Sequence, residues 1–150
     1  MADLTTTVTE SVVLNGALRG NTNTVTTTGI NNVFERIVTC LNGNVTTVAV
    51  FGTAPYSSAG AIDVQNARYI RITNLDADAW IEVAIITTDT YYVVLLTPGN
   101  SHILAQGETV ARGATGTTAG FGSLQDLTAI TVKPVGVSFD PQVSVFVAAI

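Results

Sequence analysis

The chain has 150 residues, of which 47% are hydrophobic and 11% are charged, and its formal net charge is −5 at pH 7. A single domain of this length buries roughly 70% of the surface that its unfolded chain exposes, without help from a metal or a disulfide. The acidic balance and the scattered basic residues argue against nucleic acid as a partner. Turn residues interrupt every apolar stretch before the ~20 residues that a membrane-spanning helix needs, so we expect no membrane partner.

Threonine, with 24 residues, supplies much of the polarity that the rare charged residues do not. It is β-branched and favours strands, and a surface with so little charge suits lasting contact with other protein. A simple soluble β-domain from a threonine-rich proteome would have a similar composition. The first ten residues, MADLTTTVTE, contain neither the basic segment nor the continuous apolar segment of a secretory signal. We therefore expect the protein to be made and assembled in a cytoplasm.

The start of the chain alternates in the manner of a strand and not of a helix. We predict a strand over residues 8–14. Its apolar face carries Val8, Val12 and Leu14. Glu10 interrupts that face, which places the strand near an edge or an end of a sheet. Residues 1–7 are predicted to form a flexible N-terminal arm, and Asn15-Gly16 and residues 19–23 to form turns or loops.

The next strands are predicted over residues 33–41 and 45–51, with Asn42-Gly43-Asn44 between them. Asn and Gly adopt positive φ at low cost, so this turn predicts a β-hairpin. Cys40 is the only cysteine, which excludes an intrachain disulfide. Its position on a strand-like run indicates a small buried hydrophobic residue.

Residues 68–106 contain four short β-type runs with a turn signal between each pair. Isoleucines and valines alternate with polar residues in the first two runs, which indicates strands with one buried face. The third run, from Tyr91 to Leu96, is apolar on both faces. It is therefore either a central strand or a strand whose second face is covered by another subunit.

Residues 111–123 are rich in glycine and threonine and are predicted to be an exposed loop that orders against a neighbour. No lysine follows these glycines, so a phosphate-binding loop is not indicated. Two final strands are predicted over residues 127–132 and 143–147. Eight to ten short strands at this spacing predict an all-β chain in which residues 1–150 form one antiparallel β-sandwich domain, most simply a jelly roll.

Few side chains offer chemistry. His102 is the only histidine, and we interpret it as a surface or turn residue and not as a catalytic partner of Cys40. The oxygen-bearing side chains of Asn74, Asp76, Asp78 and Glu82 recur at intervals that suggest a calcium loop, but the required glycine is missing and Glu82 comes too early. Because Asn and Asp also build turns with their own side chains, a turn is favoured. We predict no catalytic residue, metal or cofactor.

Aromatic residues could form a sugar-binding platform, and the candidates are Tyr56, Trp80, Tyr91 and Tyr92. Neighbouring residues of a strand point to opposite faces, so Tyr91 and Tyr92 cannot both belong to one platform. A place in the core or in an interface is favoured for these side chains.

Two short segments carry a family resemblance. Tyr69-Ile70-Arg71-Ile72-Thr73-Asn74-Leu75-Asp76 and Leu96-Thr97-Pro98-Gly99-Asn100-Ser101 resemble a strand end and a turn found in small β-sandwich virion proteins of tailed bacteriophages. The resemblance covers roughly residues 68–106, with weaker agreement at the C-terminal end. It implies a decoration, neck or tail component, often oligomeric.

Together these observations predict a non-enzymatic virion structural protein that self-associates, for example as a trimer, and binds the capsid surface as a decoration or cement protein. Its partners would be copies of itself and the major capsid protein or other virion proteins. The alternative is a tail, neck or fibre component with a glycan-binding role. The candidate interface residues are Tyr91, Tyr92, Val94, Leu96, Gly113, Thr115, Thr117 and Phe121.

Overall fold

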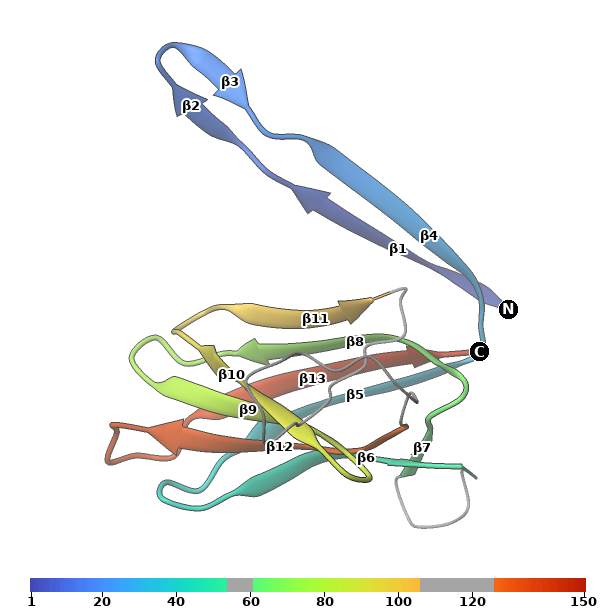
Figure 1. Cartoon of the computed structure of the whole chain (residues 1–150), viewed down its shortest axis with the longest axis vertical. Coiled ribbons are helices and arrows are strands. Elements are labelled where there is room, and N and C mark those ends of the chain that lie inside the picture. The colour runs from blue at the N-terminus through green and yellow to red at the C-terminus, as the bar shows by residue number, and fades with distance from the viewer. Residues whose placement is uncertain (54–60, 106–125) are drawn as a thin grey trace.

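The computed structural model describes residues 1–53, 61–105 and 126–150. Two β-sheets pack face to face, and a long two-stranded ribbon projects from one side of this sandwich (Figure 1). In the part of the chain that the structure describes, no helix is long and apolar enough to cross a membrane. The predicted all-β sandwich is confirmed.

Within the described residues the sandwich has nine strands, five in one sheet and four in the other. The five-stranded sheet has the order β10 (Tyr91–Leu96), β9 (Trp80–Thr87), β12 (Leu127–Val135), β6 (Thr46–Gly52) and β7 (Ala61–Asp63). The four-stranded sheet has the order β11 (Ser101–Ala105), β8 (Ala67–Asn74), β13 (Gln142–Ala149) and β5 (Asn32–Thr39).

The strand pairing is that of a jelly roll, as the sequence predicts. The antiparallel pairs β5–β13, β6–β12, β8–β11 and β9–β10 are nested along the chain. This nesting results when one long hairpin folds over into two sheets. The pairs β8–β13 and β9–β12 then close each sheet in its middle, and β7 adds a short parallel pair beside β6.

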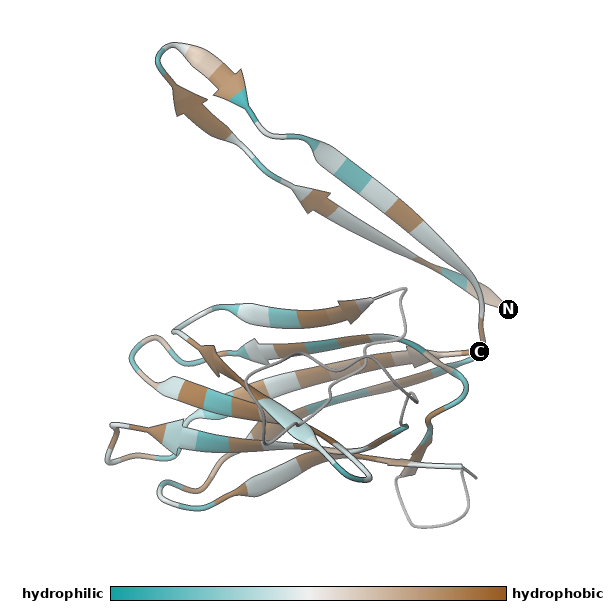
Figure 2. Cartoon of the chain, viewed as in Figure 1, coloured by the Kyte–Doolittle hydropathy of each residue, from teal (hydrophilic) through white to brown (hydrophobic). Residues whose placement is uncertain are grey.

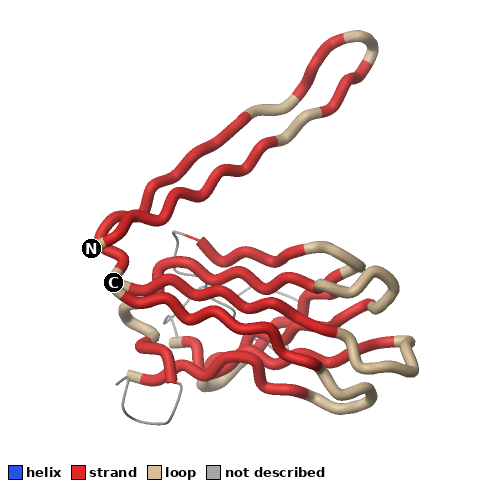
Figure 3. The backbone as a smooth tube through the Cα atoms, turned by 180° about the vertical axis from the view of Figure 1, so that it is seen from behind, coloured by secondary structure: helices blue, strands red, loops and turns tan. Residues whose placement is uncertain are grey.

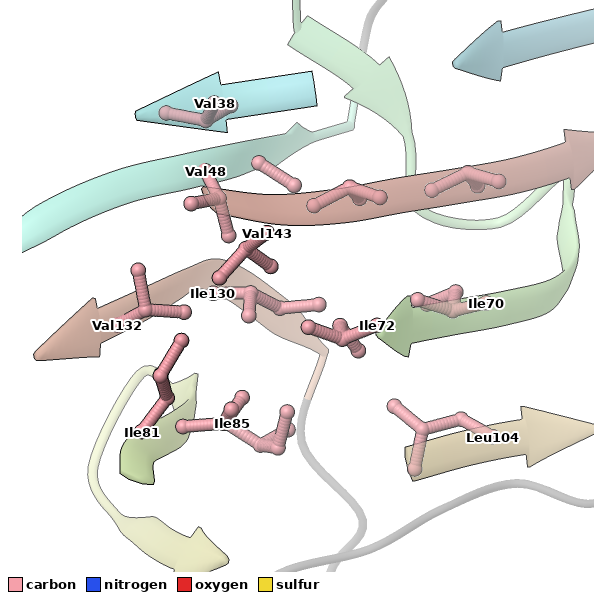
Figure 4. Close-up of a cluster of buried hydrophobic side chains, with 14 of the residues drawn as sticks. Val38, Val48, Ile70, Ile72, Ile81, Ile85, Leu104, Ile130, Val132 and Val143 are labelled. Atoms are coloured by element: carbon pink, nitrogen blue, oxygen red, sulfur yellow. The ribbon is translucent and has the colours of Figure 1, made fainter. Parts of the chain in front are cut away.

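The core lies between the two sheets and follows from the alternation of apolar residues. The inward side chains of both sheets are almost completely buried, and many of them are drawn in Figure 4. The fully buried ones include Ile72, Ile81, Ile85, Ile130, Val48, Val132 and Val143. Burying each such side chain stabilises the fold by roughly 1.5–3 kcal/mol. These residues are β-branched, so they fit the pleated surface with little loss of side-chain freedom.

The first thirty residues form the projecting ribbon, which we call the arm. Strands β1 (Ala2–Thr9) and β4 (Thr22–Ile30) pair along its length, and β2 (Val12–Leu14) and β3 (Ala17–Arg19) pair at its tip. Asn15 and Gly16 close the tip with positive φ values of 53° and 76°, which confirms the predicted turn.

The arm differs from the sequence prediction in two ways. Residues 1–7, expected to be flexible, lie mostly within β1 and are paired with β4. Residues 19–23, expected to be a loop, continue the ribbon, because Glu10 donates its backbone N–H to Asn21 O at 2.9 Å. Threonine-rich segments that look unstructured in isolation become ordered here by pairing with each other.

Two further predictions need correction. The Asn42-Gly43-Asn44 turn forms, with Gly43 at φ 75°, but it does not close a hairpin. The strands on either side of it, β5 and β6, belong to different sheets, so the turn carries the chain across the sandwich. For β10 the sequence left two alternatives, a central strand or a strand covered by another subunit. In the structure β10 is an edge strand of the five-stranded sheet, so the first alternative is wrong.

A second, smaller apolar cluster holds the base of the arm against the outer face of the four-stranded sheet. Ile30, Tyr69 and Ala148 are buried in it, and Leu4, Phe146 and Ile150 are partly buried. From this anchor the arm runs away from the sandwich, and its tip lies far from the two chain ends (Figures 1 and 3).

Candidate interaction surface

The arm has two unlike faces. Its strand pairs keep one register from Leu4 opposite Thr27 to Leu14 opposite Ala17, so alternate residues share a face along the whole ribbon. One face, which we call the hydroxyl face, is exposed and carries Thr5, Thr7, Thr9, Thr22, Thr24 and Thr26. Thr7 Oγ1 and Thr24 Oγ1 lie 3.1 Å apart across it, and Thr22 donates to Thr9 Oγ1 at 3.3 Å. Water solvates such a face without cost.

The opposite face carries the larger apolar residues, and we call it the apolar stripe. Its members are Leu4, Val25, Val8, Val12, Leu14 and Ala17, with Glu10 and Arg19 as its charged residues. Leu4 is covered at the base by the second apolar cluster. Farther out the cover ends, and the exposed fraction rises from 49% at Val8 to 56% at Val12 and 59% at Leu14. The distal half of the stripe is therefore open to solvent.

The tip adds apolar surface beyond the stripe. Val13 and Leu18 face each other across β2 and β3 on the other side of the ribbon, and they are 70% and 73% exposed. Apolar residues thus lie on both faces of the tip, and the strands of the tip are largely brown in Figure 2. An isolated two-stranded ribbon is at best marginally stable in water, so the arm has few internal means of holding its shape.

A second exposed apolar region lies on the outer face of the five-stranded sheet, and we call it the sheet patch. On edge strand β10 the outward residues Tyr91, Val93 and Leu95 are 66%, 50% and 48% exposed. From this edge the patch extends across the outer face of the sheet, over Ile86 and Ala84 of β9. It reaches Val50 of β6 through Ala129 of β12. Glu82 and Lys133, which lie opposite each other across β9 and β12, carry its opposite charges.

The register of β10 corrects the predicted interface. Tyr92, Val94 and Leu96 point inward and pack with the core, and of the four residues predicted on this strand only Tyr91 faces outward. The exposed apolar row is Tyr91, Val93 and Leu95, because a shift of one residue moves every side chain of a strand to its other face. The other predicted interface residues, Gly113, Thr115, Thr117 and Phe121, lie outside the described residues, as does the predicted loop over residues 111–123.

Two members of the suspected calcium loop, Asn74 and Asp76, serve as turn formers. Asn74 is fully buried, and its Nδ2 donates to Ala79 O at 2.7 Å and to Thr97 O at 3.2 Å. Its Oδ1 accepts the backbone N–H of Asp76. Asp76 Oδ1 in turn accepts the backbone N–H groups of Asp78 and Ala79. Among the described residues, no group of three or more His, Cys, Asp and Glu side chains could hold a metal ion.

This network also joins residues 69–76 to residues 96–101, two segments that are separate in the sequence. Asn74 joins the end of β8 to the turn between β10 and β11, and Gly99 adds a backbone bond to Asp76 O at 3.2 Å. Thr73 Oγ1 and Ser101 Oγ lie 2.7 Å apart beside it. These residues therefore fix the fold at one end of the sandwich.

His102 is half-buried, and this differs from the predicted surface position. It points inward from β11, and its Nε2 lies 3.2 Å from the hydroxyl of Tyr92 on β10. These two edge strands belong to different sheets, so the pair links the sheets along one open side of the sandwich. Burial lowers the pKa of His102 and raises the pKa of Tyr92.

Cys40 is fully buried, as predicted, and burial raises the pKa of its thiol to about 11. It follows β5, whereas His102 lies on β11 at the opposite edge of the same sheet. Three strand spacings separate these edges, about 14 Å. The two residues therefore do not form a nucleophile and base.

Trp80 and Tyr91 both face outward on the sheet patch, but they lie at opposite ends of it. Tyr91 pairs with Ile86, six residues along β9 from Trp80. At about 3.3 Å per residue the two rings are separated by about 20 Å, too far apart to hold one sugar ring between them. Tyr56 lies outside the described residues.

Comparison of the chain with known protein families, curated proteins and solved structures finds no match.

Proposed function

We propose that this chain is a non-enzymatic structural protein that self-associates and decorates the surface of a virus capsid. The observation that carries the proposal is the arm. It projects from the sandwich, it bears an apolar stripe, and no part of the chain that the structure describes covers the distal half of that stripe. A projecting apolar ribbon is of use to a protein that joins other copies or a larger surface.

The surface chemistry supports lasting association. Exposed apolar patches on a soluble chain mark interaction sites, and this chain has two such regions on different parts of the molecule. A protein with 11% charged residues has little charge with which to oppose association. Permanent assemblies tolerate such surfaces because the apolar residues are covered once assembly is complete.

The jelly roll agrees with the capsid assignment but does not select it. The fold occurs in viral capsid proteins, in lectins and in cupins, so function has to be argued from the surface. The likeness of residues 68–106 to small phage virion proteins favours the viral setting. The alternative, a tail or fibre component that binds glycans, would use Trp80, which is 47% exposed.

Sedimentation velocity of the full chain at micromolar concentration tests the self-association. We expect an oligomer that dissociates on dilution, and a strict monomer at all concentrations would overturn the proposal. Co-sedimentation with capsid shells that lack this protein then tests the surface that it binds. Binding to a glycan array that disappears in Trp80→Ala, together with no binding to shells, would favour the fibre alternative.

A further inference from the structure

The distal half of the arm has an apolar stripe that none of the other described residues covers. Antiparallel strands in water normally present one solvated face and one covered face. The hydroxyl face of the arm is the solvated one, and the apolar stripe is covered at Leu4 and open from Val8 outward. The open part is continuous with the buried part, so whatever covers it extends an apolar contact that already begins at the base of the arm.

The sheet patch is a second apolar surface of this kind. Tyr91, Val93 and Leu95 give an edge strand an apolar outer row, while Tyr92, Val94 and Leu96 fill the core on its inner side. A strand that is apolar on both faces is expected inside a protein or under another subunit. Among the described residues β10 is at the edge of its sheet, so cover by another subunit is the setting that fits it.

The two regions lie on opposite sides of the sandwich. The base of the arm packs on the outer face of the four-stranded sheet, through Tyr69 and Ala148, whereas the sheet patch is the outer face of the five-stranded sheet. The arm therefore leads away from the patch of its own chain (Figures 1 and 3). The arm can therefore meet such a patch on a second copy but not on its own chain.

Charge and area agree with such a contact. The stripe carries Glu10 and Arg19, and the patch carries Glu82 and Lys133, so each surface offers one charge of each sign to the other. The chain exposes 9030 Å², whereas a compact monomer of 15.6 kDa exposes about 7,250 Å². The excess, roughly 1,800 Å², is larger than the ~800 Å² that a standard protein–protein interface buries on each partner.

We propose that the apolar stripe of one copy, from Val8 to Leu14, docks on the sheet patch of a second copy, over Tyr91, Val93 and Leu95. The inference rests on the proposed self-association and specifies its surfaces. The contact is head-to-tail, because the arm of each copy meets the opposite side of the next. Such contacts close into a ring when the rotation between copies allows it and otherwise continue as a filament.

Cysteine cross-linking between two variants tests the contact. The single native cysteine, Cys40, is 0% exposed and does not compete. Val12→Cys chains are mixed with Val93→Cys chains under mild oxidation, and we expect their mixed disulfide to exceed either homodimer at least several-fold. Two controls are matched to these positions: Ser11→Cys, one residue away on the hydroxyl side of the arm, and Val33→Cys, on the outer face of the other sheet and 52% exposed against 50% for Val93.

The outcomes separate the inference from the proposed function. Oligomers in sedimentation together with the Val12→Cys–Val93→Cys product support both. Oligomers that cross-link through Ser11→Cys, through Val33→Cys or as Val12→Cys homodimers overturn the docking proposal alone. A chain that stays monomeric overturns the self-association on which it rests.

A charge swap provides an independent test. Glu10→Lys should weaken association about tenfold through repulsion from Lys133, and adding Lys133→Glu in the same chain should restore most of the loss. Both side chains are exposed, so the variants are expected to keep the fold. Lys133→Glu alone is the second single variant. If the double variant loses as much affinity for self-association as the two single variants combined, the pairing is contradicted.

Discussion

The sandwich and the arm are built from the same residue types but are stabilised in different ways. In the sandwich, β-branched apolar residues recur at every second position of the central strands, so that one face of each of these strands is buried under the other sheet. In the arm the same alternation gives one hydroxyl face and one apolar stripe, and only Leu4, Ile30 and their neighbours at the base are covered. The comparison teaches that alternation predicts which face needs a cover but not whether the same chain supplies it.

The largest expected contrast comes from truncating one apolar residue in each region. Ile72→Ala should lower the free energy of unfolding by about 3 kcal/mol, because it leaves a cavity in a fully buried site. Val12→Ala should leave the stability of the dilute monomer unchanged and weaken association several-fold, since it removes about 1 kcal/mol of apolar contact. Urea unfolding and sedimentation velocity measure the two effects. A destabilised monomer in Val12→Ala would mean that the stripe is covered within the chain.

The turn network at one end of the sandwich is the next most sensitive point. Asn74→Ala should cost about 2 kcal/mol, because buried carbonyls and an amide lose their partners. Asn44→Ala is the matched control, since Asn44 is an exposed turn residue with one hydrogen bond to Asn42 O. Association measured at a temperature where both variants are folded should be unchanged. Equal stability of the two variants in urea would show that the network contributes little.

The middle of the arm can be disrupted without touching either apolar surface. Gly20 has φ 116°, and a Cβ at this position would lie 2.2 Å from Glu10 O. Gly20→Ala should therefore destabilise the ribbon locally by about 1–2 kcal/mol and weaken association accordingly, with the sandwich unaffected. Gly16→Ala is the control, because its φ is also positive but nothing lies within 4 Å of the added carbon. Chemical shifts of sandwich residues that move in Gly20→Ala would contradict the independence of the two regions.

The smallest expected effect concerns pH and the sandwich alone. Burial lowers the pKa of His102 below its ordinary value of 6.5, so the folded state favours the neutral imidazole. The contribution of His102 to stability is complete above that ordinary value and is lost as the pH falls through the lower pKa of the folded state. Unfolding free energies measured from neutral to mildly acidic pH should fall more for the native chain than for His102→Gln. If the unfolding free energy has the same pH dependence in both proteins, His102 does not contribute to it.

Much of the sandwich could be predicted from the sequence, because local alternation and turn residues report on single strands. The inward rows of β8 and β9 and the Asn15-Gly16 turn are of this kind. The partner of a strand is a non-local property, which is why Asn42-Gly43-Asn44 looks like a hairpin although β5 and β6 lie in different sheets. A run that is apolar on both faces has no preferred register in the sequence, so the outward row of β10 required the structure.

The candidate interaction surface was harder to foresee. The sequence places Val8, Val12 and Leu14 on one face of a strand, but it does not predict that they are exposed. A strand whose apolar face is buried within the chain and a strand whose apolar face is exposed have the same sequence pattern. The length of the arm depends on the pairing of two segments that are individually weak. The half-buried setting of His102 depends on the proximity of β10 and β11, edge strands of different sheets.

Hydrogen exchange at two protein concentrations tests most directly whether the arm depends on a partner that the sandwich does not need. The amide of Glu10, which bonds Asn21 O, reports on the arm, and the amides of β13, paired on both sides, report on the sandwich. We predict that protection of the arm rises as concentration increases through the association midpoint, while protection of β13 stays constant. Protection of the arm that is equally strong in the dilute monomer would contradict the account.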